Sequence, residues 1–197
     1  MRDLKLKIIG IVCSPRKEGN TEILINEALK GAKENGANTE LIRIADMTIS
    51  PCDGCESCHQ DGECRIKDDM QGLYRKLLEA DGIILGSPVY FWSISSQAKT
   101  FIDRTYALRY PFHRLKNKAC GGIVVAGRRG CTGALETMNM FFLGQDMIPM
   151  GLGIAGYGNK KGDIIKDAKA MNDARSLGKQ ITEFIKKNTH EKHLTHH

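Results

Sequence analysis

Five short apolar runs alternate with longer segments of helical periodicity along this chain. The first run, LKLKIIGIVC, becomes continuously apolar, which is typical of a strand buried on both faces. The five predicted strands lie at residues 4–13, 38–44, 82–88, 120–127 and 147–156. Strands that alternate with helices form a parallel sheet covered by helices on both faces. The sequence therefore predicts an α/β fold with a five-stranded, doubly wound parallel sheet.

The segments between the runs repeat apolar residues at helical spacing. The predicted helices lie at residues 21–36, 68–79, 95–108, 134–145 and 163–187. No linker or repeat divides them, so residues 1–187 are predicted to form a single domain. The tail, residues 188–197, reads NTHEKHLTHH and holds four of the six histidines. We expect this tail to be disordered.

Composition bears on where the protein works and on what it binds. The first apolar run is too short for a signal peptide, and no run approaches the length of a membrane span. We therefore expect a cytoplasmic protein with reduced thiols and no membrane contact. The net charge is +6, but Lys and Arg are scattered and not interleaved with aromatic residues. This pattern argues against a nucleic-acid partner.

The unusual residues gather in loops that follow the predicted strands. In doubly wound sheets, ligands bind at the carboxyl ends of the strands. The loop at residues 14–21, SPRKEGNT, has neither a dinucleotide fingerprint nor a P-loop, but it precedes a helix N-terminus. Its hydroxyls, backbone N–H groups and arginine suit a phosphate group. The alternative is simple helix capping by Asn20 or Thr21, with Arg16 in solvent.

Residues 51–64 read PCDGCESCHQDGEC and contain almost no apolar side chain. The reducing compartment disfavours disulfides, and zinc sites usually use two well-separated CxxC pairs. The compact spacing is instead typical of loops that wrap an iron–sulfur cluster. It favours a [4Fe–4S] cluster, with zinc and no metal as alternatives, and His59 is expected in solvent. The predicted ligands are Cys52, Cys55, Cys58 and Cys64, in a cluster loop inserted at residues 51–66.

Two motifs, SPRKEGNT (14–21) and SPVYFWSISSQAKTFIDR (87–104), resemble the flavodoxin-like NAD(P)H-dependent FMN reductase superfamily. The spacing CxxCxxCx5C and the segment IKDDM (66–70) resemble its iron–sulfur flavoprotein branch. The resemblance implies a flavodoxin-like fold, bound FMN and a homodimer or homotetramer. Carried over by position, it places the FMN phosphate on Ser14, Arg16, Asn20 and Thr21. It places the flavin ring or ribityl chain beside Pro88, Val89, Tyr90, Phe91 and Trp92, with Gly127 in the third loop, GRRGCTG (127–133).

Together these features predict an FMN-dependent oxidoreductase. The hypothesis is an electron-transfer flavoprotein that passes electrons between a one-electron carrier such as ferredoxin and a small-molecule acceptor. The alternative is an NAD(P)H-dependent FMN or quinone reductase with structural cysteines. A redox- or metal-sensing regulator is a third class, although the sequence contains no evident DNA-binding element.

Overall fold

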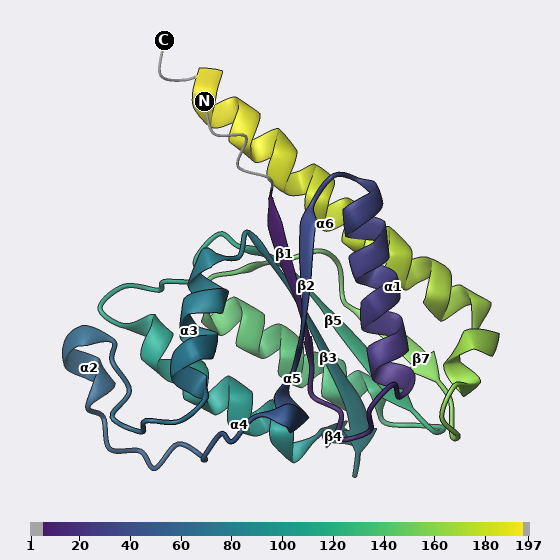
Figure 1. Ribbon diagram of the computed structural model, residues 1–197, viewed down its shortest axis with the longest axis horizontal. Coiled ribbons are helices and arrows are strands. Elements are labelled where there is room, and N and C mark those ends of the chain that lie inside the picture. Colours follow the sequence, from purple (N-terminus) through teal and green to yellow (C-terminus); the bar gives the residue numbers. More distant parts are fainter. Residues whose placement is uncertain (1–5, 195–197) are drawn as a thin grey trace.

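A computed structural model describes the backbone of residues 6–194 and the side chains of residues 6–189. Four parallel strands form the centre of its sheet in the order β2, β1, β3, β5, with helices on both sides (Figure 1). They are β1 (Lys7–Val12), β2 (Asn38–Arg43), β3 (Gly82–Tyr90) and β5 (Ala119–Ala126). This arrangement confirms the predicted doubly wound α/β fold.

The predicted fifth strand, residues 147–156, is divided into two. β6 (Ile148–Pro149) and β7 (Ile154–Tyr157) both pair in parallel with β5, one after the other along it. Between them the chain turns through Gly153, whose φ of 99° is accessible to glycine without strain. A further short strand, β4 (Ser93–Ile94), pairs antiparallel with the end of β3. Within the described residues the sheet therefore has seven strands where five were predicted.

The helices divide between the two faces of the sheet. α1 and α6 contribute to one hydrophobic core, and α3, α4 and α5 contribute to the other, while α2 lies apart in the cysteine loop (Figure 1). Their bounds are α1 (Asn20–Glu34), α2 (Cys58–Asp61), α3 (Met70–Glu79), α4 (Ser96–Arg104), α5 (Cys131–Gly144) and α6 (Ala168–Leu194). Three 3₁₀ turns are η1 (Ile44–Asp46), η2 (Thr105–Arg109) and η3 (Asp163–Lys166).

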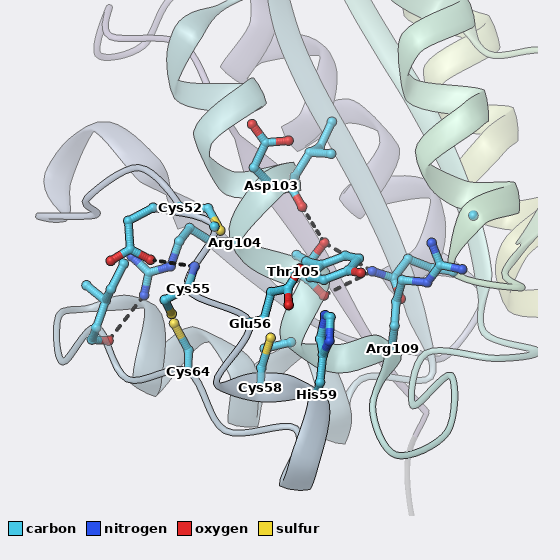
Figure 2. A pocket seen from close by; sticks show the side chains of 18 of the residues that line it. Cys52, Cys55, Glu56, Cys58, His59, Cys64, Asp103, Arg104, Thr105 and Arg109 are labelled. Atoms are coloured by element: carbon cyan, nitrogen blue, oxygen red, sulfur yellow. Dashed lines mark hydrogen bonds between the residues drawn. The ribbon is translucent and has the colours of Figure 1, made fainter.

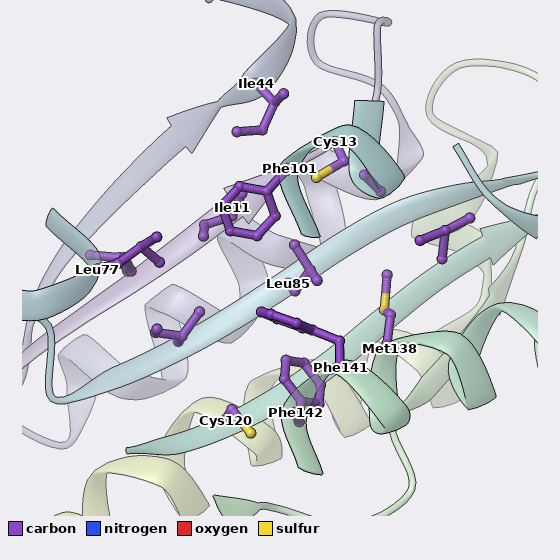
Figure 3. Packing of buried hydrophobic residues seen from close by; sticks show 14 of the residues in the cluster. Ile11, Cys13, Ile44, Leu77, Leu85, Phe101, Cys120, Met138, Phe141 and Phe142 are labelled. Atoms are coloured by element: carbon purple, nitrogen blue, oxygen red, sulfur yellow. The ribbon is translucent and has the colours of Figure 1, made fainter. Parts of the chain in front are cut away.

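The strands are buried on both faces, as their apolar composition predicts. Along β1, Ile9 and Ile11 belong to the core beneath α3, α4 and α5, whereas Ile8 and Val12 belong to the core beneath α1 and α6. Figure 3 shows the first core, where Phe101 of α4 and the aromatic side chains of α5 pack over the central strands. Because side chains alternate across a strand, a continuous apolar run serves both cores.

The C-terminal segment differs from the prediction. The segment predicted as a helix from residue 163 begins as η3, and helix α6 starts at Ala168 and extends to Leu194. Residues 188–194 of the predicted disordered tail therefore belong to a helix, and residues 195–197 lie outside the described residues. No helix in the described part is long and apolar enough to cross a membrane.

Candidate functional site

The loop between β1 and α1 has an open helix N-terminus. Gly19, the N-cap residue, is extended and provides no side-chain cap for the first N–H groups of the helix. Ser14 and Thr21 flank this loop and are 3% and 2% exposed. Uncapped N–H groups at a helix N-terminus form a natural anion site. Capping by a side chain, the alternative reading of this loop, does not occur here.

A pocket of about 200 Å³ lies over this helix end, where the carboxyl ends of β1, β3, β5 and β7 meet. Four loops supply its walls, and eight of the ten predicted flavin residues line it. They are Ser14, Arg16, Asn20, Thr21, Pro88, Val89, Tyr90 and Gly127. The structure thus brings these residues together, while their individual contacts to FMN stay predictions.

Asn20 has a structural task that the sequence did not reveal. Its side-chain amide donates hydrogen bonds to the carbonyl oxygens of Gly158 and Lys160, at 3.2 and 2.9 Å. Its side-chain oxygen accepts one from the N–H of Gly162, at 2.8 Å. The side chain therefore fastens the loop after β7 to the start of α1. Since the side chain is engaged in this way, only the backbone N–H of Asn20 remains for a phosphate.

Phe91 and Trp92, the other two predicted flavin residues, do not line this pocket. They form the two-residue turn of the β3–β4 hairpin, and both have positive φ, 48° and 69°. This conformation is strained for aromatic residues, and turns of this kind usually carry Asn or Gly. The Phe91 side chain is 99% exposed, whereas the backbone of Trp92 lies against Gly130 in the third loop. The turn therefore displays Phe91 to solvent beside the pocket.

The loop after β7 supplies pocket residues that sequence reasoning missed. Gly158, Asn159 and Lys161 line the pocket, and Lys161 forms a 2.8 Å ion pair with Glu18 of the first loop. A Cβ atom on Gly127 would lie 2.4 Å from the side-chain oxygen of Asn159, so these two loops approach closely. The signal was present, because the segment GYGNKKG follows the last strand, where ligand loops gather.

The four loop cysteines share a second cavity. It has a volume of about 540 Å³, and its opposite wall comes from the end of α4, from η2 and from the end of α5. Figure 2 shows Cys58 and His59 rising from α2 toward the chain around Thr105. Partial burial and the negative charges that the other three cysteines can carry raise the pKa of the Cys58 thiol. All four sulfur ligands predicted from the sequence therefore line one cavity.

The base of the cysteine loop is held by hydrogen bonds to charged side chains. Arg104, whose side chain is fully buried, binds both oxygens of Asp68 and two backbone carbonyls that flank the loop. Asp68 in turn accepts a hydrogen bond from the N–H of Ser50, at 2.9 Å. The N–H of Thr48 donates to Asp69, at 2.7 Å. These contacts bring the two ends of the loop together, while α2, farther along the loop, lies against η2.

Buried polar atoms without a hydrogen-bond partner are concentrated at this cavity. Among the described residues there are four such side-chain atoms, and three of them belong to residues that line it. These three are Arg104 Nε, His59 Nε2 and Gln145 Oε1. His59 was expected in solvent, but its ring is half-buried and stacks on Tyr110, with ring centroids 4.4 Å apart. Native proteins rarely leave such atoms unpaired, and three of the four belong to residues of this one cavity wall.

The donor set fits an iron–sulfur cluster. Four thiolates line the cavity, and soft sulfur ligands suit iron–sulfur clusters or zinc. Among the described residues, however, no three His, Cys, Asp or Glu side chains stand ready to hold a metal ion. All four thiols line the same cavity, and metal–thiolate bonds would order a loop with so few apolar side chains. The remaining cysteines, Cys13, Cys120 and Cys131, are buried in the core, where burial raises the pKa of each thiol.

The two cavities are lined by different segments of the chain and share no lining residue. Helix α4 connects them. Its N-cap Ser95 donates a 2.8 Å hydrogen bond to the carbonyl of Cys13 at the end of β1, and its last residue is Arg104. Nine residues of helix span about 13 Å. The cysteine loop follows β2, whose carboxyl end lies at the same edge of the sheet as the first pocket, and the last residues of α4 line its cavity.

Comparison with known proteins decides the family. Residues 6–161 match the profile of the NADPH-dependent FMN reductases. This chain belongs to that family. An iron–sulfur flavoprotein of Methanocaldococcus jannaschii is 42% identical to it over 190 residues, which cover 92% of this chain and 98% of the relative. An iron–sulfur flavoprotein of Archaeoglobus fulgidus is 33% identical over 192 residues, covering 90% and 94%.

Solved structures agree on the fold. The crystal structure of RosB with the bound intermediate 8-demethyl-8-formylriboflavin-5′-phosphate matches this chain with a TM-score of 0.74 at 17% identity. The match covers 94% of this chain and 81% of RosB. The family match and the iron–sulfur flavoprotein relatives make this chain a member of the iron–sulfur flavoprotein branch of the FMN reductase family and an FMN-dependent oxidoreductase.

Proposed function

We propose that this flavoprotein passes electrons between a one-electron carrier such as ferredoxin and a small-molecule acceptor. FMN occupies the pocket over the α1 N-terminus, and Cys52, Cys55, Cys58 and Cys64 hold a [4Fe–4S] cluster. A cluster supplies single-electron transfer, and the flavin handles one electron or two. The observation that carries the proposal is the cavity lined by all four cysteines, together with three residues that hold unpaired buried polar atoms.

The basic residues near the cysteine loop and after β5 bear on which electron carrier could dock there. Of the basic residues that flank the loop, Arg65 forms an ion pair with Asp53, and Lys67 donates to the carbonyl of Cys64, at 3.2 Å. Arg128 and Arg129 follow β5 and are exposed. An acidic carrier would dock on exposed basic residues such as these, and charge of this kind increases the rate of encounter. The rate should fall as salt screens the charges.

A homodimer or homotetramer is part of the proposal. Phe91 is an almost fully exposed aromatic side chain at a strained turn beside the flavin pocket. Large exposed aromatic residues are enriched at protein interfaces. Light scattering on the Phe91→Ser variant tests this. If the oligomer uses the turn, the variant should dissociate at a higher protein concentration than the wild type.

The identity of the electron donor distinguishes the proposed function from the alternative. We expect reduced ferredoxin to reduce the flavin much faster than NADH or NADPH in anaerobic stopped-flow experiments. A nicotinamide donates hydride directly to flavin, so a reductase that uses it needs no cluster. The Cys58→Ser variant should lose the ferredoxin rate and keep its FMN. Rapid reduction by NADPH that is unchanged in Cys58→Ser would support the alternative, an NAD(P)H-dependent FMN or quinone reductase with structural cysteines.

A further inference from the structure

Arg104 is the most buried charged side chain near the cysteine cavity. It is the last residue of α4, its side chain is 0% exposed, and it lines the cavity. An isolated buried guanidinium is unfavourable, so its burial requires partners. Asp68 is the ionic partner, at 2.6 Å and with an 8% exposed side chain. The pair is therefore neutral overall but strongly directional.

Four of the five guanidinium N–H groups have acceptors. Nη1 donates to the carbonyl of Ser50, at 2.7 Å, and to Asp68. Nη2 donates to the carbonyl of Ile66 and to Asp68, at 3.2 and 3.1 Å. Ser50 lies two residues before the first loop cysteine, and Ile66 lies two residues after the last. One side chain from α4 thus joins both ends of the loop.

The fifth group, Nε–H, is buried and has no acceptor among the described residues. Leaving such a donor unpaired costs about 1–3 kcal/mol. A lysine would not have this cost, because its only side-chain nitrogen is terminal and it has no equivalent of Nε–H. Burial opposes the charge of Arg104, but its hydrogen bond to Asp68 and the nearby charges that Tyr74 and Cys64 can carry raise its pKa. Cys64 and Arg104 line the same cavity.

We propose that Arg104 is the positioning residue of the thiolate site: its Nη groups close the cysteine loop, and its Nε–H is held for a sulfur acceptor in the cavity. The inference rests on the proposed function, because the acceptor belongs to the cluster and its cysteine ligands. Hydrogen bonds to sulfur stabilise the more negative, reduced form of a cluster. Arg104 therefore sets the reduction potential as well as the shape of the loop.

The test compares Arg104→Lys with Arg75→Lys in anaerobically purified protein. A lysine can pair with Asp68 but cannot bind both flanking carbonyls, and it has no equivalent of Nε. Arg75 is exposed on α3, so the same substitution there is a matched control. The readouts are amide hydrogen exchange of residues 51–65, iron and sulfide content, the cluster potential from a titration followed by electron paramagnetic resonance, and FMN content.

In Arg104→Lys we expect at least tenfold faster exchange in the loop, a more negative cluster potential and unchanged FMN content. Exchange and potential that both match Arg75→Lys would overturn the inference while leaving the proposed function intact. Wild-type protein without iron and sulfide would contradict the proposed function and, with it, the role of Nε–H. In that case the exchange rates still decide whether Arg104 closes the loop.

Discussion

The loop at residues 14–21, which we expect to bind the FMN phosphate, provides a quantitative prediction for FMN affinity. Arg16 and Thr21 line the pocket over the uncapped N-terminus of α1. Arg16→Ala removes a charged donor, and Thr21→Val removes a hydroxyl with almost no change in shape. The neighbouring Lys17 has the same charge as Arg16 but does not line the pocket, and it lies 3.5 Å from Asp46. Lys17→Ala is therefore a matched control.

The size of the effect follows from exposure. Hydrogen bonds to a charged group contribute about 1.5–3 kcal/mol, and the exposed position of Arg16 places it at the low end, near 1.5 kcal/mol. The buried Thr21 hydroxyl contributes about 1 kcal/mol. These values correspond to about a thirteenfold and a fivefold rise in Kd, and to about seventyfold in the double variant if the effects add.

Quenching of FMN fluorescence during titration of the apoprotein measures these constants. We expect Lys17→Ala to leave Kd within about twofold of the wild type, since an exposed ion pair contributes little. The Arg16→Ala effect should shrink as ionic strength rises, whereas the Thr21→Val effect should not. Equal Kd values for Arg16→Ala and Lys17→Ala would refute the assignment of the loop to the phosphate.

Three further predictions concern stability and metal content. A Cβ on Gly178 would lie 1.8 Å from the carbonyl oxygen of Ala28, so Gly178→Ala should destabilise the α1–α6 packing by about 2–3 kcal/mol in urea unfolding. Gly72→Ala, in an open part of α3, should stabilise by about 0.5–1 kcal/mol, and equal effects would contradict the packing argument. Burial opposes ionisation of Asp68, but hydrogen bonds from Arg104 and backbone N–H groups lower its pKa. The ionised carboxylate therefore stabilises the folded protein fully above the pKa of Asp68 in the unfolded chain. This stabilisation is lost as the pH falls through its pKa in the folded protein. Asp68→Asn should therefore be less stable than the wild type at pH 7, with a gap that narrows below about pH 4; a constant gap would exclude this role. Cys120→Ala should leave iron content intact, because Cys120 is fully buried in the core, and loss of iron with a native fold would contradict the ligand assignment.

Much of the fold was readable from the sequence. The continuous apolar run of β1 predicted a strand buried on both faces, and Ile8, Ile9, Ile11 and Val12 are all 0% exposed. The division of residues 147–156 was not predicted, because a glycine within an apolar run can mark a bulge in one strand as well as a turn between two. Polar, His-rich sequence suggested disorder for residues 188–194, but these residues extend α6, and adding residues to an existing helix avoids the cost of nucleation.

The sequence predicted which residues share a pocket, but it did not predict which other residues their side chains contact. Strand–loop order was enough to predict that eight of the proposed flavin residues share one pocket, because the carboxyl ends of parallel strands meet at one edge. The engagement of Asn20 with the loop after β7 depends on residues about 140 positions away, so local sequence could not reveal it. The same holds for Arg104, which reads as an ordinary helix residue but closes the cysteine loop 54 positions earlier.

The central claim is that the cysteine loop holds a four-iron cluster beside a flavin domain. Iron, inorganic sulfide and FMN content of freshly made anaerobic protein tests it most directly. We predict about four iron, four sulfide and one FMN per chain, with iron and sulfide lost and FMN kept when Cys52, Cys55, Cys58 or Cys64 is replaced by Ser. Stoichiometric zinc without inorganic sulfide would contradict the account.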